Sequence, residues 1–346
     1  MIVGVKEKLK ENEIIYFWGK LLRNCRKSDF RQLVMKYSGA DIVCVNHPGK
    51  LYPDCLVYPI MGDGCANTGF FAQLRHTLNL LSYADFYKLT PVICWTGEWN
   101  YKEEKLVNGT NNVYEYYFQQ PSNIAEADIN RCRNVVNSSG GGGQKFIDLE
   151  WNAQTYRDMH SFVGQYSSLY LKYCKLNMIT KRYIDENIEN LLNKKKTLGI
   201  HVRSTDFKKA FDKHPVYVNT YDFLEPAKKL LEKYSYQQIF LATDSMEAVE
   251  LFRGEFGDKL VFYNDVLRSD GDVGVHCLKS KRVNHHYKLG LEILRDCYTL
   301  ASCDSLLAGL SQVSFAARYI RVANGMEYND IVILDHGINR NYNKTK

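Results

Sequence analysis

A regular alternation of strand-like and helix-like segments across residues 197–334 constrains the fold of this 346-residue chain more than any other feature. Short runs of apolar and β-branched residues predict strands at 197–203, 238–243, 260–263, 305–308 and 330–334. Apolar residues at helical spacing predict helices between them at 221–234, 245–256, 287–302 and 312–322. Strands that alternate with helices form a parallel sheet with helices on its faces. This half of the chain is therefore predicted to be a doubly wound α/β domain.

The preceding half predicts a second, less regular α/β unit. Strands are expected at 41–45 and 91–95, on either side of a helix at 71–89. The run 137–143, which ends in four glycines, is interpreted as a flexible loop.

Length and composition fit two domains of ordinary size. A chain of 346 residues with 45% hydrophobic residues can bury two cores. The helical stretch at 184–196 leads into the second half, so we expect an N-terminal domain at 1–196 and a C-terminal domain at 197–346. With 24% charged residues, the composition excludes disordered, collagen-like and coiled-coil chains.

The net charge limits the partners that we expect for this chain, and the cysteine pattern indicates its cellular compartment. The net charge of +6 is well below the concentrated positive charge of most nucleic-acid-binding proteins, so no nucleic-acid partner is expected. No run of apolar residues reaches the length of a membrane span. The ten cysteines form no CxxC pair and are interpreted as reduced thiols of a cytoplasmic protein.

The first thirty residues predict a basic amphipathic helix, in which six apolar residues alternate with Lys and Arg. Such a helix can pack its apolar stripe on its own domain, or it can lie on an anionic membrane surface. Peripheral membrane contact through this segment is therefore one expectation for the chain.

The end of the first strand in the C-terminal half carries the sharpest candidate site. His201 and Arg203 stand two residues apart, so they face the same side of the strand. Ligands of open parallel sheets bind at the carboxyl ends of the strands. Arg203 presents a charged fork that suits a phosphate group. The alternative is a surface arginine beside a core histidine.

Two more strand ends offer polar groups at the same edge. Asp244 follows the strand at 238–243, where it could serve the site or only cap the next helix. Ser311 and Gln312 open a helix, whose N-terminus favours a phosphate. An ordinary capped turn is the alternative there. Taken together, the three strand ends predict a nucleotide site.

The N-terminal half offers one candidate contact and the chain offers no metal motif. Gly69 and Phe70 stand at the start of the helix expected at 71–89, where a glycine allows close approach of a ligand. The nine histidines lack partners at metal-ligand spacing, so no metal is expected.

These motifs together resemble the GDP-fucose fucosyltransferase superfamily of GT-B fold, most closely its α1,6 branch of core fucosyltransferases and nodulation-factor enzymes. Gly69-Phe70 with Gln73-Leu74 and His76 is similar to the family segment GFG-x-QL-H-H. The stretch 201–206 is similar to HVRRTDK, with Ser204 in place of the second arginine and Phe207 in place of the lysine. The remaining matches are Ala242-Thr243-Asp244 to ATDD, Gly274-Val275-His276 to GLH, Asp296 to an aspartate that recognises guanine, and Ser311-Gln312-Val313 to SSQV.

The resemblance implies two Rossmann-like domains that face a cleft, and residue roles within it. Arg203 would hold the β-phosphate of GDP-fucose, together with Ser311 and Gln312. Asp296 would bind guanine and His201 the nucleoside, while Asp244, Gly69 and Phe70 would complete the donor site. Asp206 and Asp212 are the carboxylates nearest the motif and therefore the candidate catalytic bases.

By the same resemblance, the chain would be an inverting, metal-independent glycosyltransferase that moves fucose to a glycan or lipid-linked glycan acceptor. Synthesis of a surface polysaccharide or another glycoconjugate is the expected setting. Two alternatives stay open: an enzyme that uses another nucleotide sugar such as GDP-mannose, and a non-catalytic nucleotide- or glycan-binding protein of the same fold.

Overall fold

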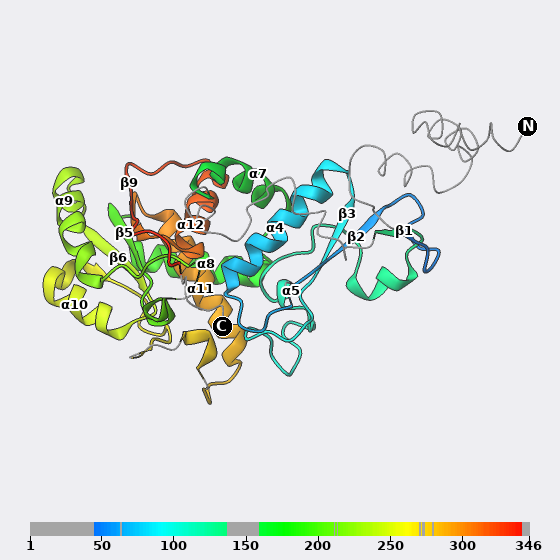
Figure 1. Cartoon of the computed structure of the whole chain (residues 1–346), viewed down its shortest axis with the longest axis horizontal. Helices are drawn as coiled ribbons and strands as arrows, with labels where there is room; N and C mark the ends of the chain where they lie inside the picture. Colours follow the sequence, from blue (N-terminus) through cyan, green and yellow to red (C-terminus); the bar gives the residue numbers. More distant parts are fainter. Residues whose placement is uncertain are drawn as a thin grey trace, which may run out of the picture.

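The computed structural model describes residues 45–136 and 159–340, apart from positions 63, 211, 213, 270, 272, 273 and 279. These residues form two sheets, one in each half of the chain (Figure 1). The basic segment 1–30, most of the strand expected at 41–45 and the glycine-rich run 137–143 lie outside the described residues.

The N-terminal sheet is built around one parallel βαβ unit. Its strands are β1 (Val45–Asn46), β2 (Val57–Met61), β3 (Thr90–Cys94) and β4 (Val135–Val136), in the order β1-β4-β2-β3. The helix α4 (Phe70–Phe86) links β2 to β3, which pair in parallel. The prediction of this helix and of β3 is confirmed, whereas β2 was not predicted. A short helix, α5 (Val113–Tyr117), and the 3-10 helix η1 (Glu126–Arg131) follow β3.

The C-terminal half forms a five-stranded parallel sheet. Its strands are β5 (Thr197–Val202), β6 (Gln238–Thr243), β7 (Leu260–Val261), β8 (Ser305–Gly309) and β9 (Ile331–Leu334). The order β7-β6-β5-β8-β9 is the 3-2-1-4-5 order of a Rossmann-type sheet. The order reverses between β5 and β8, and this switch point is where such sheets bind ligands. All five predicted strands and the doubly wound arrangement are confirmed.

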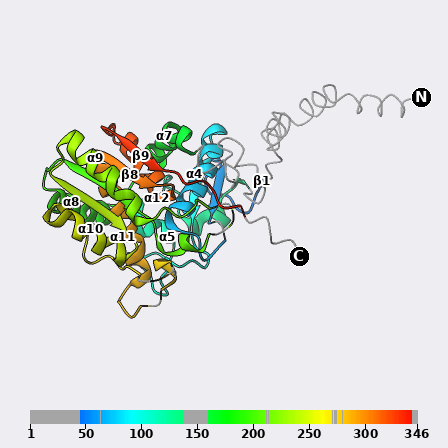
Figure 2. The same cartoon turned by 60° about the vertical axis from the view of Figure 1, so that its left-hand side comes forward.

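Four helices cover this sheet, two on each face. They are α9 (Leu224–Tyr234), α10 (Met246–Phe256), α11 (His285–Ser302) and α12 (Gln312–Ala323). Leu198, Ile200 and Val202 of β5 belong to the core under α9 and α10. The alternate position Gly199 faces α11, because a Cβ there would lie 3.0 Å from Cys303 Cβ. Figure 1 shows α9 and α10 on one side of β5 and β6 and α11 and α12 on the other, and Figure 2 shows the same elements turned by 60°.

Two helices before residue 197 pack against the C-terminal half. They are α7 (Val163–Tyr173), which was not predicted, and α8 (Met178–Leu192). Arg295 of α11 donates to Tyr183 Oη at 2.6 Å and to Asn187 Oδ1 at 3.1 Å, both on α8. The helix predicted at 184–196 ends earlier, because Asn193 adopts a left-handed conformation with φ 46°.

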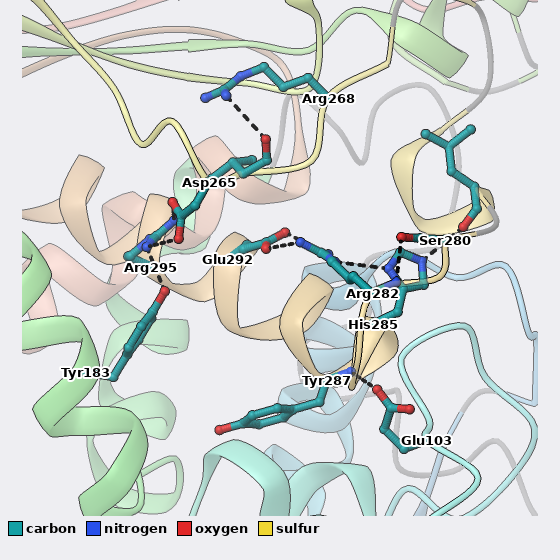
Figure 3. Close-up of polar contacts among 12 residues, drawn as sticks. Glu103, Tyr183, Asp265, Arg268, Ser280, Arg282, His285, Tyr287, Glu292 and Arg295 are labelled. Carbon is teal, nitrogen blue, oxygen red and sulfur yellow. Dashed lines mark hydrogen bonds and ion pairs between the residues drawn. The ribbon is translucent and has the colours of Figure 1, made fainter.

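The start of α11 is held by the N-terminal half. Its N-cap residue Asn284 provides no side-chain cap, and Glu103 Oε1 instead accepts from the Tyr287 amide at 2.8 Å (Figure 3). Tyr117 Oη donates to the Tyr287 carbonyl at 2.9 Å, and the two rings stack with centroids 5.5 Å apart. An anionic cap at a helix N-terminus satisfies amide donors and complements the helix dipole. The two halves are thus joined at one end of α11.

We expect Gly290→Ala to loosen this junction. A Cβ at position 290 would lie 2.2 Å from Tyr117 Oη, so the tyrosine must move. Such overpacking lowers the free energy of unfolding by about 1–3 kcal/mol. Urea unfolding measures the change. Gly254→Ala on α10 is the control, since a Cβ there meets nothing within 4 Å. Equal stability of both variants would contradict this account of the junction.

Candidate functional site

A cavity of about 440 Å³ lies where the switch point of the C-terminal sheet faces the start of α4. Both halves contribute to its wall. The lining residues are Cys65, Asn67, Thr68, Gly69, Phe70, Phe71, Ala72, Arg75, His76, Tyr101, Arg203, Phe207, His214, Ile293, Ser311, Gln312 and Val313. Within the described part of the chain, this lining includes no carboxylate. Two arginines, two histidines and the first turns of two helices give it the character of an anion site.

Arg203 is held in place by Asp244. The Arg203 guanidinium donates to Asp244 Oδ2 at 2.5 Å, and the Thr205 hydroxyl donates to the same oxygen at 2.6 Å. The Ser204 amide donates to Asp244 Oδ1 at 3.0 Å. One carboxylate at the end of β6 therefore fixes the turn that follows β5. Ser245, and not Asp244, caps α10, because its hydroxyl accepts from the Ala248 amide.

Phe207 also supports Arg203. Its ring centroid lies 5.6 Å from the guanidinium carbon, which is the geometry of a cation–π contact. Phe207 belongs to the 3-10 helix η4 (Thr205–Lys209). Both residues line the cavity. Phe207, which stands where the similar motif HVRRTDK has a lysine, therefore lies against Arg203.

Ser311 begins α12 and combines two roles. Its hydroxyl accepts from the Ser314 amide at 3.0 Å and lies 3.3 Å from His201 Nδ1. The sequence left open whether Ser311 only caps the helix or also serves a site. Ser311 does cap α12, and together with Gln312 and Val313 it also lines the cavity. The first amides of a helix have no acceptor within the helix and carry partial positive charge.

His201 faces a second, smaller cavity of about 70 Å³. Its side chain is buried, and burial lowers the pKa of the imidazole to about 4. The ring is therefore neutral at neutral pH, when it can accept or donate a hydrogen bond without carrying charge. Arg203 lines this cavity as well as the larger one, so it stands at the junction between them.

Asp296 lines the smaller cavity from α11. Burial raises the pKa of its carboxyl to about 7, against the opposing influence of Arg295 and Arg268. Arg295 makes its bidentate ion pair with Asp265, at 2.6 and 3.0 Å (Figure 3). Glu292, one turn earlier on the helix, pairs with Arg282. Asp296 is thus a buried acceptor, and the arginine that lowers its pKa most, Arg295, is itself paired with Asp265.

Gly69 and Phe70 form the opposite wall. Gly69 has an ordinary φ of −65°, and a Cβ there would meet nothing within 4 Å. No contact inside the described protein requires a glycine, which suits close approach by a ligand. Phe70 packs in an aromatic cluster, stacked on Trp99 with centroids 5.8 Å apart and edge-on to Tyr101 at 5.5 Å.

The structure distributes the predicted site residues over these two cavities. Gly69, Phe70, Arg203, Ser311 and Gln312 line the larger one. The smaller cavity is lined by His201, Arg203, Asp244 and Asp296. Asp212 is exposed and does not belong to either lining, and the side chain of Asp206, in η4, lies outside the described part of the chain.

Sequence reasoning missed Arg75 and Tyr101. Arg75 lines the larger cavity from α4, and Tyr101 lines both cavities. A helical projection of α4 could have found the arginine, because it places positions 72, 75 and 76 on one face at the start of the helix. Tyr101 belongs to the loop after β3 and gives no comparable signal.

The described residues contain no group of three or more His, Cys, Asp or Glu that could hold a metal ion. They also contain no helix long and apolar enough to cross a bilayer.

The fold and the cavity define a class: an α/β protein with a Rossmann-type sheet whose ligand cleft lies between two halves. The chain matches no protein-family model and no curated protein. It is similar to a solved NodZ α-1,6-fucosyltransferase co-crystallised with GDP, with 17% identity and a TM-score of 0.49, over 83% of this chain and 99% of that one. It is also similar to fucosyltransferase NodZ from Bradyrhizobium, with 17% identity and a TM-score of 0.45, over 78% and 93%. A third similar structure is POFUT1 in complex with GDP-fucose, with 10% identity and a TM-score of 0.48, over 82% and 99%.

We expect Asp244→Ala to destabilise the fold as well as the site. The change leaves the partly buried Arg203 and two further donors without their acceptor. Loss of such a group costs about 2–4 kcal/mol of unfolding free energy. Urea unfolding tests this against Glu247→Gln, which breaks the exposed pair with Lys208 and should cost less than about 0.5 kcal/mol. Similar losses in the two variants would show that Asp244 does not organise the turn.

Proposed function

We propose that the protein is a glycosyltransferase that moves fucose from GDP-fucose to a glycan acceptor with inversion at the anomeric carbon. The observation that carries the proposal is the place of Arg203 at the junction of the two cavities. A diphosphate at Arg203 and the start of α12 would direct its nucleoside toward the smaller cavity. Its sugar would then lie in the larger cavity, where the N-terminal half can bring the acceptor.

Arg203 would act on the leaving group. The bond between the anomeric carbon and the β-phosphate oxygen breaks as the acceptor hydroxyl attacks from the opposite face, and negative charge grows on the phosphate. A fixed guanidinium and the amides at the start of α12 stabilise that charge more in the transition state than in the ground state. In this proposal the guanidinium and these amides stabilise the leaving group without a metal ion.

Asp296 would select the base. A guanine presents two adjacent N–H donors on one edge, and a buried carboxylate accepts both. The neutral imidazole of His201 would contact the nucleoside beside Ser311. A uracil or thymine offers a single N–H on that edge, so it would leave one carboxylate oxygen without a donor.

Asp206 and Asp212 are the proposed bases that take the proton of the acceptor hydroxyl. Asp206 belongs to η4, which directly follows Arg203, and Asp212 lies near the cavity residue His214 in sequence. We further propose a cytoplasmic setting in surface polysaccharide synthesis, a glycan or lipid-linked glycan as acceptor, and contact of residues 1–30 with the membrane surface.

A panel of nucleotides tests the donor class. Thermal unfolding should shift upward with GDP and GDP-fucose and not with UDP or dTDP, because a ligand at a hundred times its dissociation constant adds about 2.7 kcal/mol. Arg203→Ala should abolish the shift. The control Arg131→Ala removes an exposed arginine from η1 and should keep it.

The same assay, together with a measurement of GDP release, separates the alternatives. Stabilisation by GDP-mannose in preference to GDP-fucose would favour a different donor sugar. Binding of GDP-fucose with no release of GDP, in the presence or absence of candidate acceptors, would identify a binding protein. No stabilisation by any guanine nucleotide would overturn the proposed donor.

The affinity for GDP-fucose should depend on pH through Asp296. The free carboxyl has a pKa of about 7, and donors from guanine favour its ionised form. Binding therefore releases a proton below pH 7, and the affinity should fall toward tenfold per pH unit as the pH drops, while staying level above. Calorimetric titration measures this, and the sugar diphosphate itself does not titrate in the range. Asp296→Asn should bind weakly with a flat profile, whereas a slope that persists in this variant would exclude Asp296 as its source.

A further inference from the structure

Arg75 brings a second guanidinium to the larger cavity, from the opposite half of the protein. It lies on α4 and is 7% exposed. The neighbouring lining positions Gly69, Ala72 and His76 follow the spacing of one helical face. An arginine that is mostly buried and still lines a cavity faces a small space that a ligand can fill.

Tyr166 of α7 holds this guanidinium in position. The two side chains form a hydrogen bond, and the Tyr166 hydroxyl donates in turn to Asn79 Oδ1 at 2.6 Å. The Tyr166 ring packs against Phe315 of α12, with centroids 5.0 Å apart. Arg75 is thus placed among α4, α7 and the first turns of α12, whose N-terminus lines the same cavity.

The tyrosine that orients Arg75 carries no charge. Burial raises the pKa of this tyrosine to about 12, so its hydroxyl is uncharged at neutral pH. Arg203 is oriented by a carboxylate, that of Asp244, at 2.5 Å. A diphosphate ester carries one negative charge on each phosphate. A single arginine that already shares its charge with a carboxylate gives incomplete compensation for such a ligand in a partly closed cavity.

The residue after Arg203 is not a second cation. It is Ser204, which is 1% exposed and gives its amide to Asp244. Arg75 and the starts of α4 and α12 bring further positive charge to the described lining. The cavity therefore surrounds its ligand with charge from both halves.

We propose that Arg75 is a phosphate-binding residue that clamps the diphosphate of the donor against Arg203 across the cleft. The inference rests on the proposed function in that the ligand is a nucleoside diphosphate or its sugar ester. It adds that binding draws on both halves. It also sets the substrate class, since a nucleoside monophosphate offers one phosphate instead of two to the pair of arginines and should bind far more weakly.

Inorganic pyrophosphate is the probe that separates this inference from the choice of nucleotide. We expect Arg75→Gln to weaken pyrophosphate and GDP binding at least tenfold in calorimetric titration and to leave guanosine binding unchanged. Arg321→Gln is the matched control. It removes a buried arginine that donates to the carbonyls of Ala301 and Cys303, and it should alter stability without altering pyrophosphate affinity.

Each outcome decides the question. If Arg75→Gln binds pyrophosphate as the unchanged chain does, or loses guanosine and GDP equally, Arg75 acts only in the packing of α4 and the clamp is wrong. If pyrophosphate binding depends on both arginines while no guanine ligand binds, the clamp stands and the proposed donor fails.

A measurement on the unchanged chain covers the case in which Arg75→Gln does not fold. In protein labelled with ¹⁵N-arginine, the Nε–H signal of Arg75 is assigned by its absence in Arg75→Lys, which keeps the charge. Saturating pyrophosphate should shift the Arg75 and Arg203 signals and leave that of Arg321 in place. An Arg75 signal that does not move would overturn the proposal.

Discussion

The ion pair between Arg203 and Asp244 is the interaction on which the geometry of the site depends. It joins the carboxyl ends of two adjacent strands, β5 and β6, which pair in parallel up to Val202 and Thr243. The same carboxylate also receives the Ser204 amide and the Thr205 hydroxyl. The path of the chain after β5 and the direction of Arg203 are therefore set by one acidic side chain. A ligand at Arg203 meets a guanidinium that is already oriented, which reduces the entropic cost of binding.

This brace has an electrostatic consequence. A carboxylate that orients an arginine also takes up part of its charge, so a strongly anionic ligand needs positive charge from another source. The start of α12 supplies positive charge from the C-terminal half, and Arg75 of α4 supplies it from the N-terminal half. Tyr166, which holds Arg75, is uncharged at neutral pH. The two arginines are thus held in two different ways, one by a carboxylate and the other by a tyrosine.

The fold of the C-terminal half could be predicted from the sequence because its strands are short, apolar and separated by helices of regular period. The same logic located Arg203, Asp244 and Ser311 at one edge, since carboxyl ends of parallel strands meet. It failed for β2, a five-residue strand that contains a proline. It also failed for α7, whose buried face consists mainly of tyrosines, a residue type that is also common at protein surfaces. Arg75 could have been found from the face of α4 that it shares with Ala72 and His76, but its contact with Tyr166 of α7 is visible only in three dimensions. Capping by Ser245 instead of Asp244 likewise follows from the contacts of Asp244 with β5, which no local pattern reveals.

Helix α11 links the site to the junction between the halves. Its start is capped by Glu103 and packed on Tyr117, both from the N-terminal half, and its middle carries Asp296 into the smaller cavity. Gly290, between these two regions, lets Tyr117 lie directly on the helix backbone. An α-helix transmits displacement along its axis with little internal deformation, because each turn is hydrogen-bonded to the next. The wall of the smaller cavity that Asp296 forms is therefore fixed relative to the N-terminal half, although Asp296 belongs to the C-terminal one. A ligand that spans Asp296, Arg203 and the start of α4 touches three elements whose relative positions this one helix controls.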